Sequence, residues 1–438
     1  MANLFRKFKG GIHPPQQKNT KNLEVVEMPI PKNVVIPVSQ HIGAFTTVIV
    51  KKGDQVKVGQ KICDSDEFIS APIHASVSGK VIDVKAVLSA SGAEVMSVFI
   101  ESDGKQELHP DIKPLTNLTK EELVQAIRES GLVGLGGAGF PTHVKLSPPK
   151  EKVLDTLIVN AAECEPYITS DYREMIENAE GVISGIKIVM DLLGIKNTVI
   201  GIESNKPIAI KKFKELLKDN PSITVKNLPT RYPQGGEKQL IYAITKKKVP
   251  SGGLPLDVGV LVQNVATLSF IDSFIKTGMP LIKKTVTVDG SAVKNPMNVK
   301  VPVGTMLKDV FEFCGGFTQE PYKVIMGGPM MGVSQFSLEN PIIKNTNAIL
   351  ALTKKDAIIP KEGNCIRCGR CIAACPMRLL PYQFHANVRL GRIDDTLDYN
   401  IRDCIECGCC SYVCPSKLYL VQSIRFAKSE LMAKNDKK

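Results

Sequence analysis

Two cysteine runs near the C-terminal end of the sequence constrain the fold more than any other feature. Nine of the 12 cysteines lie between Cys365 and Cys414. Each run fits the spacing C-x2-C-x2-C-x3-C-P, which is typical of bacterial ferredoxins with two iron–sulfur cubanes. Three cysteines can surround three corners of one cubane, while the fourth reaches the other cubane. The spacing therefore predicts two 4Fe–4S clusters, the first held by Cys365, Cys368, Cys371 and Cys414 and the second by Cys404, Cys407, Cys410 and Cys375.

Zinc is the alternative ligand for a cysteine-rich segment. Structural zinc usually binds paired C-x2-C knuckles, whereas each run here places four cysteines within 11 residues and ends on a proline. Cys409 lies beside Cys410, but only Cys410 preserves the spacing. The 28-residue spacer between the runs is longer than the hairpin of a plain ferredoxin. Helical patterns over Leu379–Val388 and Arg392–Asn400 predict a helical two-cluster ferredoxin variant.

Length and composition predict a cytoplasmic, multidomain protein. The 438 residues are enough for about three domains, and 43% hydrophobic with 23% charged residues excludes wholesale disorder. No apolar run approaches the roughly 18–20 residues of a membrane helix. The basic segment Met1–Gly11 lacks the apolar stretch of a secretory signal. Clustered cysteines are typical of metal binding in a reducing compartment.

The charge balance points to acidic partners. The sequence has 56 basic and 44 acidic residues, a net charge of +12, which suits a nucleic acid, an anionic membrane face or an acidic protein. Cluster thiolates and a bound phosphate would offset part of this charge. Aromatic residues make up only 5% of the chain, which leaves few platforms for stacking bases. We therefore expect no nucleic-acid partner.

Residue patterns divide the rest of the chain into three blocks. Short β-branched runs between turn signals predict an all-β module over Val35–Ser102. Helical and strand patterns alternate over Thr119–Ile275, which predicts an α/β domain, and short strands return over Lys284–Pro341. The polar segment after Glu430 is expected to fray. The expected elements are a helix that begins after Thr119, strands over Val153–Asn160 and Thr198–Ile202, helices over Ala179–Leu193 and Thr305–Phe313, and strands over Thr285–Val288 and Tyr322–Met326.

The β module resembles the biotinyl/lipoyl sandwich. The resemblance rests on the turn-rich segment Lys52–Gln60, followed by Ala71–Ile73 and Ser78–Val81. Carriers of that kind need a lysine on an exposed hairpin tip, and Ala71–Gly79 contains none. We therefore expect a docking or structural role for this module.

A glycine-rich loop offers a candidate phosphate site. Residues 134–139 contain G-x-G-x-x-G, but a helix precedes the loop where a dinucleotide fold needs a strand, and Pro141 prevents the long helix that should follow. The glycines still let backbone N–H groups approach an anion, and Lys145 adds a positive charge. A merely tight turn is the alternative. Three further polar clusters follow expected strands or turns, around Asn160 and Glu165, Tyr232 and Gly235, and Gln263, Asn264 and Thr267.

These segments, in this order, resemble a known family. They read G-x-G-G-A-G-F-P-T-x-x-K, N-A-x-E-x-E-P, Y-x-x-G-x-E and N-V-x-T, and are similar to the flavin-bearing, NADH-oxidising subunit of respiratory complex I. Together with the opening Gly10–Pro15 and the C-terminal cysteines, the layout resembles the RnfC family, which supplies one subunit of the Rnf complex. The resemblance implies an α/β plus β architecture with an N-terminal extension (1–30), a barrel-sandwich-like β module (31–110), an α/β domain that binds FMN and NADH (111–280), a β-grasp ligand-binding module (281–350), a two-cluster ferredoxin-like domain (351–430) and a disordered tail (431–438).

The resemblance also implies which residues hold the ligands. No side chain is expected to act as a catalytic residue, because the flavin accepts the hydride. FMN would be bound by Gly134, Gly136, Gly137, Gly139, Lys145, Asn160, Tyr232, Gly235, Gln263, Asn264 and Thr267. NADH would contact Phe140, Lys145, Glu165 and Glu237. The chain departs from the complex I pattern at Leu135, Ala162, Gly236 and Pro148.

The function implied is that of a subunit through which NADH and a ferredoxin:NAD oxidoreductase complex exchange electrons. Its partners would be other Rnf subunits, including membrane-embedded ones and an iron–sulfur subunit, on the cytoplasmic face of the membrane. The chain would be peripheral, and Na+ or H+ movement would take place in other subunits. Three alternatives stay open: a soluble cobalamin (corrin) reductase, a ferredoxin-like relay whose glycine loops are purely structural, and a zinc-bearing nucleic-acid binder.

Overall fold

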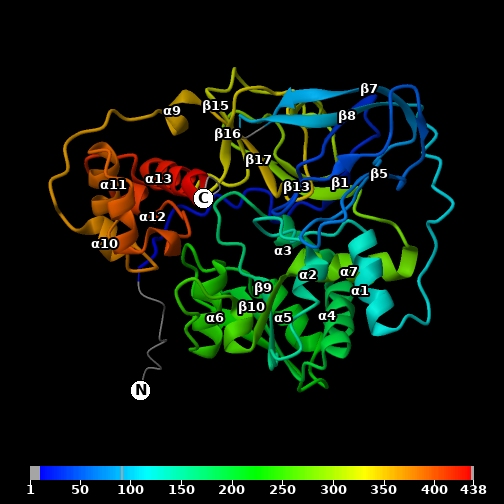
Figure 1. The fold of residues 1–438 in the computed structure, drawn as a ribbon, viewed down its shortest axis with the longest axis horizontal. Coiled ribbons are helices and arrows are strands. Elements are labelled where there is room, and N and C mark those ends of the chain that lie inside the picture. The colour runs from blue at the N-terminus through cyan, green and yellow to red at the C-terminus, as the bar shows by residue number, and fades with distance from the viewer. Residues whose placement is uncertain (1–9, 90–91, 436–438) are drawn as a thin grey trace.

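The computed structural model describes residues 10–89 and 92–435. Figure 1 shows the green α/β domain below the blue and yellow β modules, with the orange and red cysteine-bearing module at one end. This mixed α/β and β architecture confirms the predicted fold class. Within the described ranges, every helix is either too short or too polar to span a lipid bilayer.

The N-terminal β module packs two antiparallel sheets around one core. One sheet has the strand order β2 (Asn33–Pro37), β8 (Glu94–Ser102), β7 (Gly79–Leu88) and β4 (Gln55–Val56). The other has the order β3 (Thr47–Val48), β5 (Lys61–Asp64) and β6 (Ile73–His74). Alternating apolar residues such as Ile36, Ile62 and Val98 are fully buried between the sheets. The predicted all-β module is therefore confirmed.

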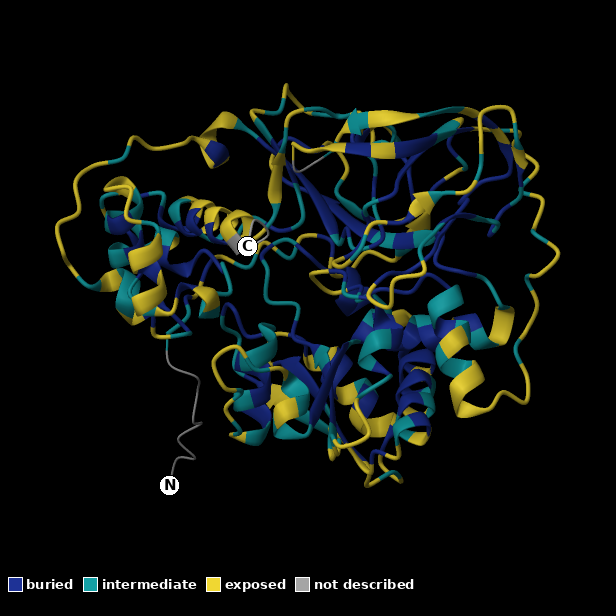
Figure 2. Ribbon diagram, in the orientation of Figure 1, coloured by how far each residue is buried: buried dark blue, intermediate teal, exposed yellow. Residues whose placement is uncertain are grey.

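The α/β domain is built on a parallel sheet. Its strand order is β11 (Ile223–Leu228), β10 (Asn197–Glu203), β9 (Thr156–Ala161) and β12 (Val260–Asn264). Leu157 and Val159 pack with helices on one face and Ile158 with helices on the other, so β9 is buried on both sides. Strands β9 and β12 are mostly dark blue in Figure 2. The first face is covered by α3 (Ser170–Glu177), α4 (Ala179–Leu193), α5 (Pro207–Leu216) and α7 (Val265–Thr277), and the second by α6 (Glu237–Thr245) and η1 (Pro255–Val258).

Several predicted elements of this domain are confirmed by local chemistry. Helix α1 (Lys120–Glu129) begins after Thr119, whose hydroxyl accepts from the Glu122 amide at 3.2 Å while the Glu122 carboxylate accepts from the Thr119 amide at 2.8 Å. Helix α4 has the predicted bounds and ends at Gly194 in the left-handed conformation. Strand β9 begins three residues later than predicted, because Val153 lies in an exposed loop.

The third sheet includes a strand from the N-terminal segment. Its order is β1 (Val25–Glu27), β14 (Met297–Pro302), β13 (Lys283–Asp289), β17 (Ala348–Leu352), β15 (Lys323–Met326) and β16 (Val333–Gln335), and α8 (Leu307–Phe313) packs on its core. The predicted strands and helix of this block are confirmed. The segment expected as an N-terminal extension (1–30) supplies β1 as a parallel edge strand. Strand β17 also crosses the boundary expected at residue 350 and is followed by α9 (Lys354–Ala357).

The cysteine-bearing module is helical, as predicted. It contains α10 (Arg370–Ala374), α11 (Pro381–Arg389), η2 (Asp394–Tyr399), η3 (Ile401–Asp403), α12 (Cys409–Val413) and α13 (Leu420–Asn435). The second helix of the spacer is a short 3-10 helix, because Asn400 takes a left-handed conformation that ends it. The tail was expected to be disordered over residues 431–438. The structure differs as far as Asn435, because helix α13 continues to that residue and Leu431 is buried. Residues 436–438 lie outside the described ranges.

Candidate functional site

The four cysteines assigned to the second cluster line one cavity. Cys409 lines the same cavity beside them. The Leu379 amide donates to Cys375 Sγ at 3.3 Å, and the Glu406 amide donates to Cys404 Sγ at 3.4 Å. Burial raises the pKa of the Cys404 thiol to about 11, so a thiolate here needs a neighbouring cation, which iron supplies. The residues present therefore fit a cluster ligated by Cys375, Cys404, Cys407 and Cys410.

The first-cluster cysteines lie nearer the surface. Cys365 and Cys368 are exposed on the loop before α10, while Cys414 is buried. Burial, and to a smaller extent the nearby Cys414, raises the pKa of the Cys371 thiol. Among the described residues, no three His, Cys, Asp or Glu side chains converge on a site for a single metal ion. A cubane places its iron atoms at separate corners, so its cysteines surround a body instead of a point.

The glycine-rich loop packs against the start of helix α7. A Cβ atom on Gly136 would lie 2.2 Å from Asn264 Nδ2, whereas one on Gly137 would meet nothing within 4 Å. Asn264 caps α7, because its Oδ1 accepts from the Ala266 amide at 2.8 Å. The Leu135 amide donates to Thr267 Oγ1 at 3.0 Å. The open glycine backbone thus lies beside a helix N-terminus, which is a favourable place for a phosphate.

The remaining loops bring further polar groups to the same end of the sheet. Lys145 on α2 (Thr142–Lys145) contacts Glu237 Oε1 at 3.1 Å and donates to the Val262 carbonyl at 3.2 Å. Asn160 Nδ2 donates to the Gly235 carbonyl at 2.8 Å. Gln263 Nε2 is buried and has no hydrogen-bond partner among the described residues. A buried donor without a protein partner, next in sequence to Asn264, fits a ligand rich in acceptors, as a flavin is.

The loop also holds Phe140 and Gly139, which were predicted as ligand contacts. Phe140 is half-buried, and its carbonyl accepts from the Gly134 amide at 2.9 Å. Gly139 has a φ of 70°, a left-handed conformation that favours glycine. The Gly139 carbonyl accepts from the Ile42 amide of the barrel-sandwich module at 3.3 Å. These two positions shape the loop through their backbone atoms.

Two predicted site residues point elsewhere. The Glu165 carboxylate accepts from the Met330 and Met331 amides at 3.0 Å each, so it faces the turn between β15 and β16. Burial raises the Glu165 pKa to about 7. Tyr232 is fully buried, and its hydroxyl donates to the Cys407 carbonyl at 2.7 Å. Tyr232 thus reaches a second-cluster cysteine, and Glu165 contacts a turn of the third sheet.

The sequence reasoning missed Lys18. Its Nζ donates to three carbonyls of the N-A-x-E-x-E-P segment and its continuation, those of Glu163 at 2.9 Å, Glu165 at 2.8 Å and Ile168 at 2.6 Å. Burial lowers the Lys18 pKa. No local pattern marks this lysine, because its partners lie about 150 residues further along the chain.

Residues 10–27, here called the N-terminal strap, join this segment to the cysteine-bearing module. The Gly11 amide donates to the Ala374 carbonyl at 2.8 Å. Ile12 and Tyr232 pair as a short antiparallel bridge. A Cβ atom on Gly10 would lie 2.4 Å from the Cys375 carbonyl oxygen. The strap thus contacts the flavin-type loops and a second-cluster cysteine together.

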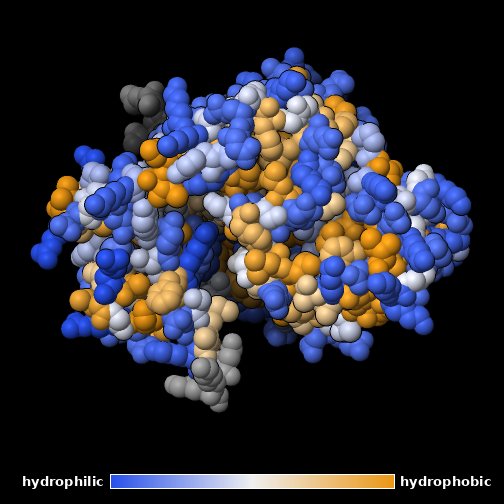
Figure 3. All heavy atoms as spheres, turned by 90° about the horizontal axis from the view of Figure 1, so that it is seen from above, coloured by the Kyte–Doolittle hydropathy of each residue, from blue (hydrophilic) through white to orange (hydrophobic). Residues whose placement is uncertain are grey.

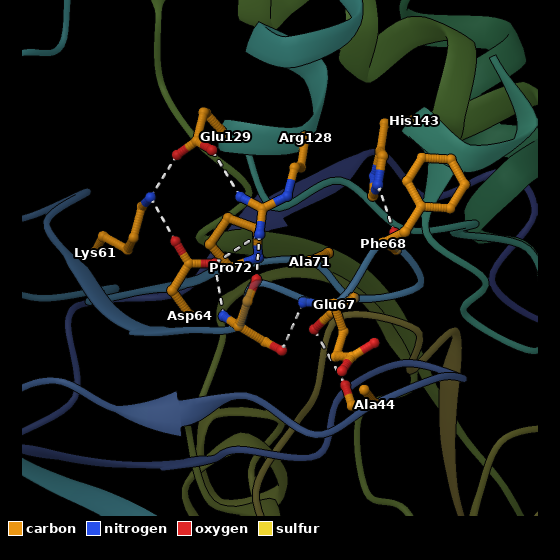
Figure 4. Close-up of polar contacts among 12 residues, drawn as sticks. Ala44, Lys61, Asp64, Glu67, Phe68, Ala71, Pro72, Arg128, Glu129 and His143 are labelled. Atoms are coloured by element: carbon orange, nitrogen blue, oxygen red, sulfur yellow. Dashed lines mark hydrogen bonds and ion pairs between the residues drawn. The ribbon is translucent and has the colours of Figure 1, made fainter. Parts of the chain in front are cut away.

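The barrel-sandwich module packs beside the glycine-rich loop. Figure 4 shows an ion-pair network between the module and the end of helix α1, in which Arg128 contacts Asp64 at 3.0 Å and Glu129 at 2.7 Å, and Lys61 contacts Asp64 at 2.7 Å. In the same view His143 Nε2 lies 2.9 Å from a carbonyl oxygen of Phe68. These contacts fasten the module to the flavin-type domain; its docking or structural role stays a prediction.

Fold and site together define a protein of the flavin- and iron–sulfur-dependent electron-transfer class. Four family models match the chain: the RnfC barrel sandwich hybrid domain at residues 6–105, the Nuo51 FMN-binding domain at 127–273, the SLBB domain at 285–334 and the 4Fe–4S dicluster domain at 364–418. The chain thus has a flavin-binding domain of the complex I type and a two-cluster ferredoxin-like domain, as the resemblance implied.

Curated relatives extend over nearly the whole chain. A Clostridium ljungdahlii protein, named as a subunit of a proton-translocating ferredoxin:NAD+ oxidoreductase complex, is 48% identical and covers 99% of this chain and 96% of its own length. The counterpart from the Na+-translocating complex of Acetobacterium woodii is 47% identical and covers 98% of each. A subunit of the ion-translocating oxidoreductase complex of Rhodobacter capsulatus is 42% identical and covers 100% of this chain and 86% of its own. The chain belongs to the RnfC family.

A solved structure supports the fold. An NAD+-reducing NiFe hydrogenase chain aligns with a TM-score of 0.50 and 17% identity, over 64% of this chain and 54% of its own length. At this identity the likeness concerns the fold alone.

Proposed function

We propose that this chain exchanges electrons between NADH and an ion-translocating ferredoxin:NAD+ oxidoreductase complex, with FMN and two 4Fe–4S clusters as its cofactors. It acts on the cytoplasmic face of the membrane, bound to the other subunits, which carry the ion. The FMN-binding and dicluster matches and the named relatives support this function. The observation that carries it is the Tyr232–Cys407 hydrogen bond, because it joins a flavin-type loop to a second-cluster ligand.

The chain's own residues bind and orient the cofactor. The phosphate would lie against the glycine loop at Gly136 and Gly137 and the N-terminus of α7, with Lys145 as its positive charge. Asn160, Gln263, Asn264 and Thr267 would hold the rest of the flavin, and Glu237 would face the nucleotide beside Lys145. When bound, FMN supplies the conversion between a hydride and single electrons, which iron–sulfur cubanes lack.

The two cysteine sets differ in their distance from this site. Second-cluster residues contact the flavin-type domain, since Tyr232 reaches Cys407 and Gln239 Nε2 donates to the Pro376 carbonyl at 3.2 Å. First-cluster Cys365 and Cys368 are exposed at the surface. The proposed electron path therefore has the second cluster on the flavin side and the first cluster toward the surface.

The test is a visible spectrum of the anaerobically purified chain before and after NADH. We expect flavin bands near ~450 nm on an iron–sulfur shoulder near ~400 nm, both of which bleach. A shoulder without flavin, and without bleaching after reconstitution with FMN, would contradict the proposal. The chain would then be a relay, and its glycine loops only turns.

A further inference from the structure

The surface around the first-cluster cysteines is formed by two adjacent segments. The loop before α10 and the segment after α12 lie side by side, because the Gly363 amide donates to the Ser416 carbonyl at 2.9 Å. Cys365 and Cys368 are exposed on this surface. We call it the distal face and define it by the exposed residues Lys361, Cys365, Ile366, Arg367, Cys368, Arg370, Tyr412 and Lys417.

The cations of the distal face lack internal partners. Within residues 10–89 and 92–435, the side chains of Lys361, Arg367, Arg370 and Lys417 form neither an ion pair nor a hydrogen bond. Other cations of the same module are paired, because Arg425 contacts Glu406 at 3.1 Å and Lys428 contacts Glu406 at 2.8 Å.

The acidic residue of this region is already engaged. Glu362 Oε1 accepts from the Tyr419 amide at 2.6 Å. Four free cations outnumber this one carboxylate, so the side chains of the distal face carry a net positive charge, part of which the cluster thiolates would offset.

Apolar groups lie among these cations. Ile366 is 66% exposed and Tyr412 is 49% exposed. Figure 3 shows hydrophobic and hydrophilic residues side by side at the cysteine-bearing end of the molecule. An apolar centre, with tyrosine and arginine enriched, is the composition of protein interfaces.

We infer that the distal face docks an acidic redox subunit of the same complex. The inference rests on the proposed function, because the exposed cysteines are useful only if a partner receives or supplies electrons there. The guanidinium group of arginine can donate two parallel hydrogen bonds to one carboxylate, which fixes the geometry of the pair. Unpaired cations also steer an acidic partner toward the cluster and speed its association at low salt.

Binding is the measurement that tests this inference. Membrane vesicles from cells that lack this subunit but keep the rest of the complex are mixed with the cluster-loaded chain and sedimented at two salt concentrations. We expect Arg367→Glu/Arg370→Glu to weaken binding by roughly tenfold or more and to reduce its salt dependence. Lys51→Glu/Lys52→Glu, the same charge change on the exposed surface of the barrel-sandwich module, is the matched control and should bind as the wild type does.

Further readouts separate the inference from the proposed function and from loss of a cluster. NADH oxidation with ferricyanide as acceptor tests the proposed function without the partner, and the iron–sulfur EPR signal tests cluster content. If the Arg367→Glu/Arg370→Glu variant loses a cluster, the Lys361→Glu/Lys417→Glu variant is tested in its place. The same loss of binding is expected. Unchanged binding by a cluster-replete variant would overturn the inference. Equal binding of the wild type to liposomes of the same lipids would also overturn it, because a lipid surface would then be the partner.

Discussion

At the scale of single residues, the question is which of the adjacent Cys409 and Cys410 ligates the second cluster. Cys409 is fully buried, and its Sγ lies 3.9 Å from the Tyr232 carbonyl, while the neighbouring Cys410 preserves the ligand spacing. Cys409→Ala should keep both clusters, whereas Cys410→Ala should lose the second and about half of the iron. Iron and sulfide content per chain, with EPR of the reduced protein, gives the answer. Loss of half the iron from Cys409→Ala would make Cys409 the ligand.

Lys145 is the residue on which flavin affinity should depend most. Its ammonium group is held by Glu237 and the Val262 carbonyl, beside the loop proposed for the phosphate. Lys145→Met should weaken FMN binding by roughly tenfold or more, since a hydrogen bond to a charged group contributes about 1.5–3 kcal/mol. Quenching of FMN fluorescence by the flavin-free chain measures Kd. The control is Lys152→Met, which removes an ion pair with Asp257 in the same domain; equal Kd values for the two variants would remove Lys145 from the site.

At the scale of elements, the N-terminal strap should position the second cluster. Gly10 has a φ of 82°, and a Cβ atom there would strike the Cys375 carbonyl oxygen. Gly10→Ala should therefore displace the strap from α10. We expect flavin reduction by NADH to keep its rate while cluster reduction slows by roughly tenfold, because small displacements have large kinetic effects. Stopped-flow absorbance separates the two events.

The control for this prediction shares the backbone strain but not the contact. Gly104 has a φ of 73°, and a Cβ atom there would meet nothing within 4 Å. Gly104→Ala should leave both rates unchanged. Equal slowing in Gly10→Ala and Gly104→Ala would show that strain alone, and not the strap contact, is responsible.

The elements that sequence reasoning predicted well are those specified by neighbouring residues. Thr119 and Glu122 cap α1 within one turn, and α4 carries a continuous apolar pattern. The strap was missed because Lys18 meets its carbonyl partners 145 residues or more along the chain. The contact of Glu165 with the β15–β16 turn was not predicted for the same reason, since the Met330 amide that donates to its carboxylate lies 165 residues away. Local spacing predicts ligands and caps, but not which distant loop packs on them.

At the scale of the whole molecule, Lys344 ties three modules together. Its Nζ donates to the Pro72 carbonyl of the barrel sandwich at 2.6 Å and to the Gly131 carbonyl of the flavin-type domain at 2.7 Å. Lys344 itself lies between β16 and β17 and is fully buried. Burial lowers its pKa to about 7, against smaller opposing effects of Cys63 and Asp64. A neutral amine has two N–H groups, so it still satisfies both carbonyls.

This junction predicts a pH dependence of stability. Between about pH 7 and the ordinary lysine pKa of 10.5, the unfolded chain binds a proton at Lys344 that the folded chain does not, so stability rises with pH. Below pH 7 Lys344 is protonated in both the folded and the unfolded chain, so burial of its charge lowers the free energy of unfolding by the full amount. Lys344→Met removes this group, so the free energy of unfolding of the wild type should rise by up to about 1.4 kcal/mol per pH unit relative to that of the variant from pH 7 to pH 9.

His41 and His74 also face this lysine, but burial lowers the pKa of each imidazole, so they titrate below that window. The measurement is the difference in Tm between wild type and variant at pH 7 and at pH 9. Lys308→Met is the control, because the hydrogen bond to Glu339 raises the pKa of Lys308 and keeps this lysine charged at both pH values. A Tm difference between wild type and Lys344→Met that is the same at pH 7 and pH 9 would mean that Lys344 keeps its proton inside the junction.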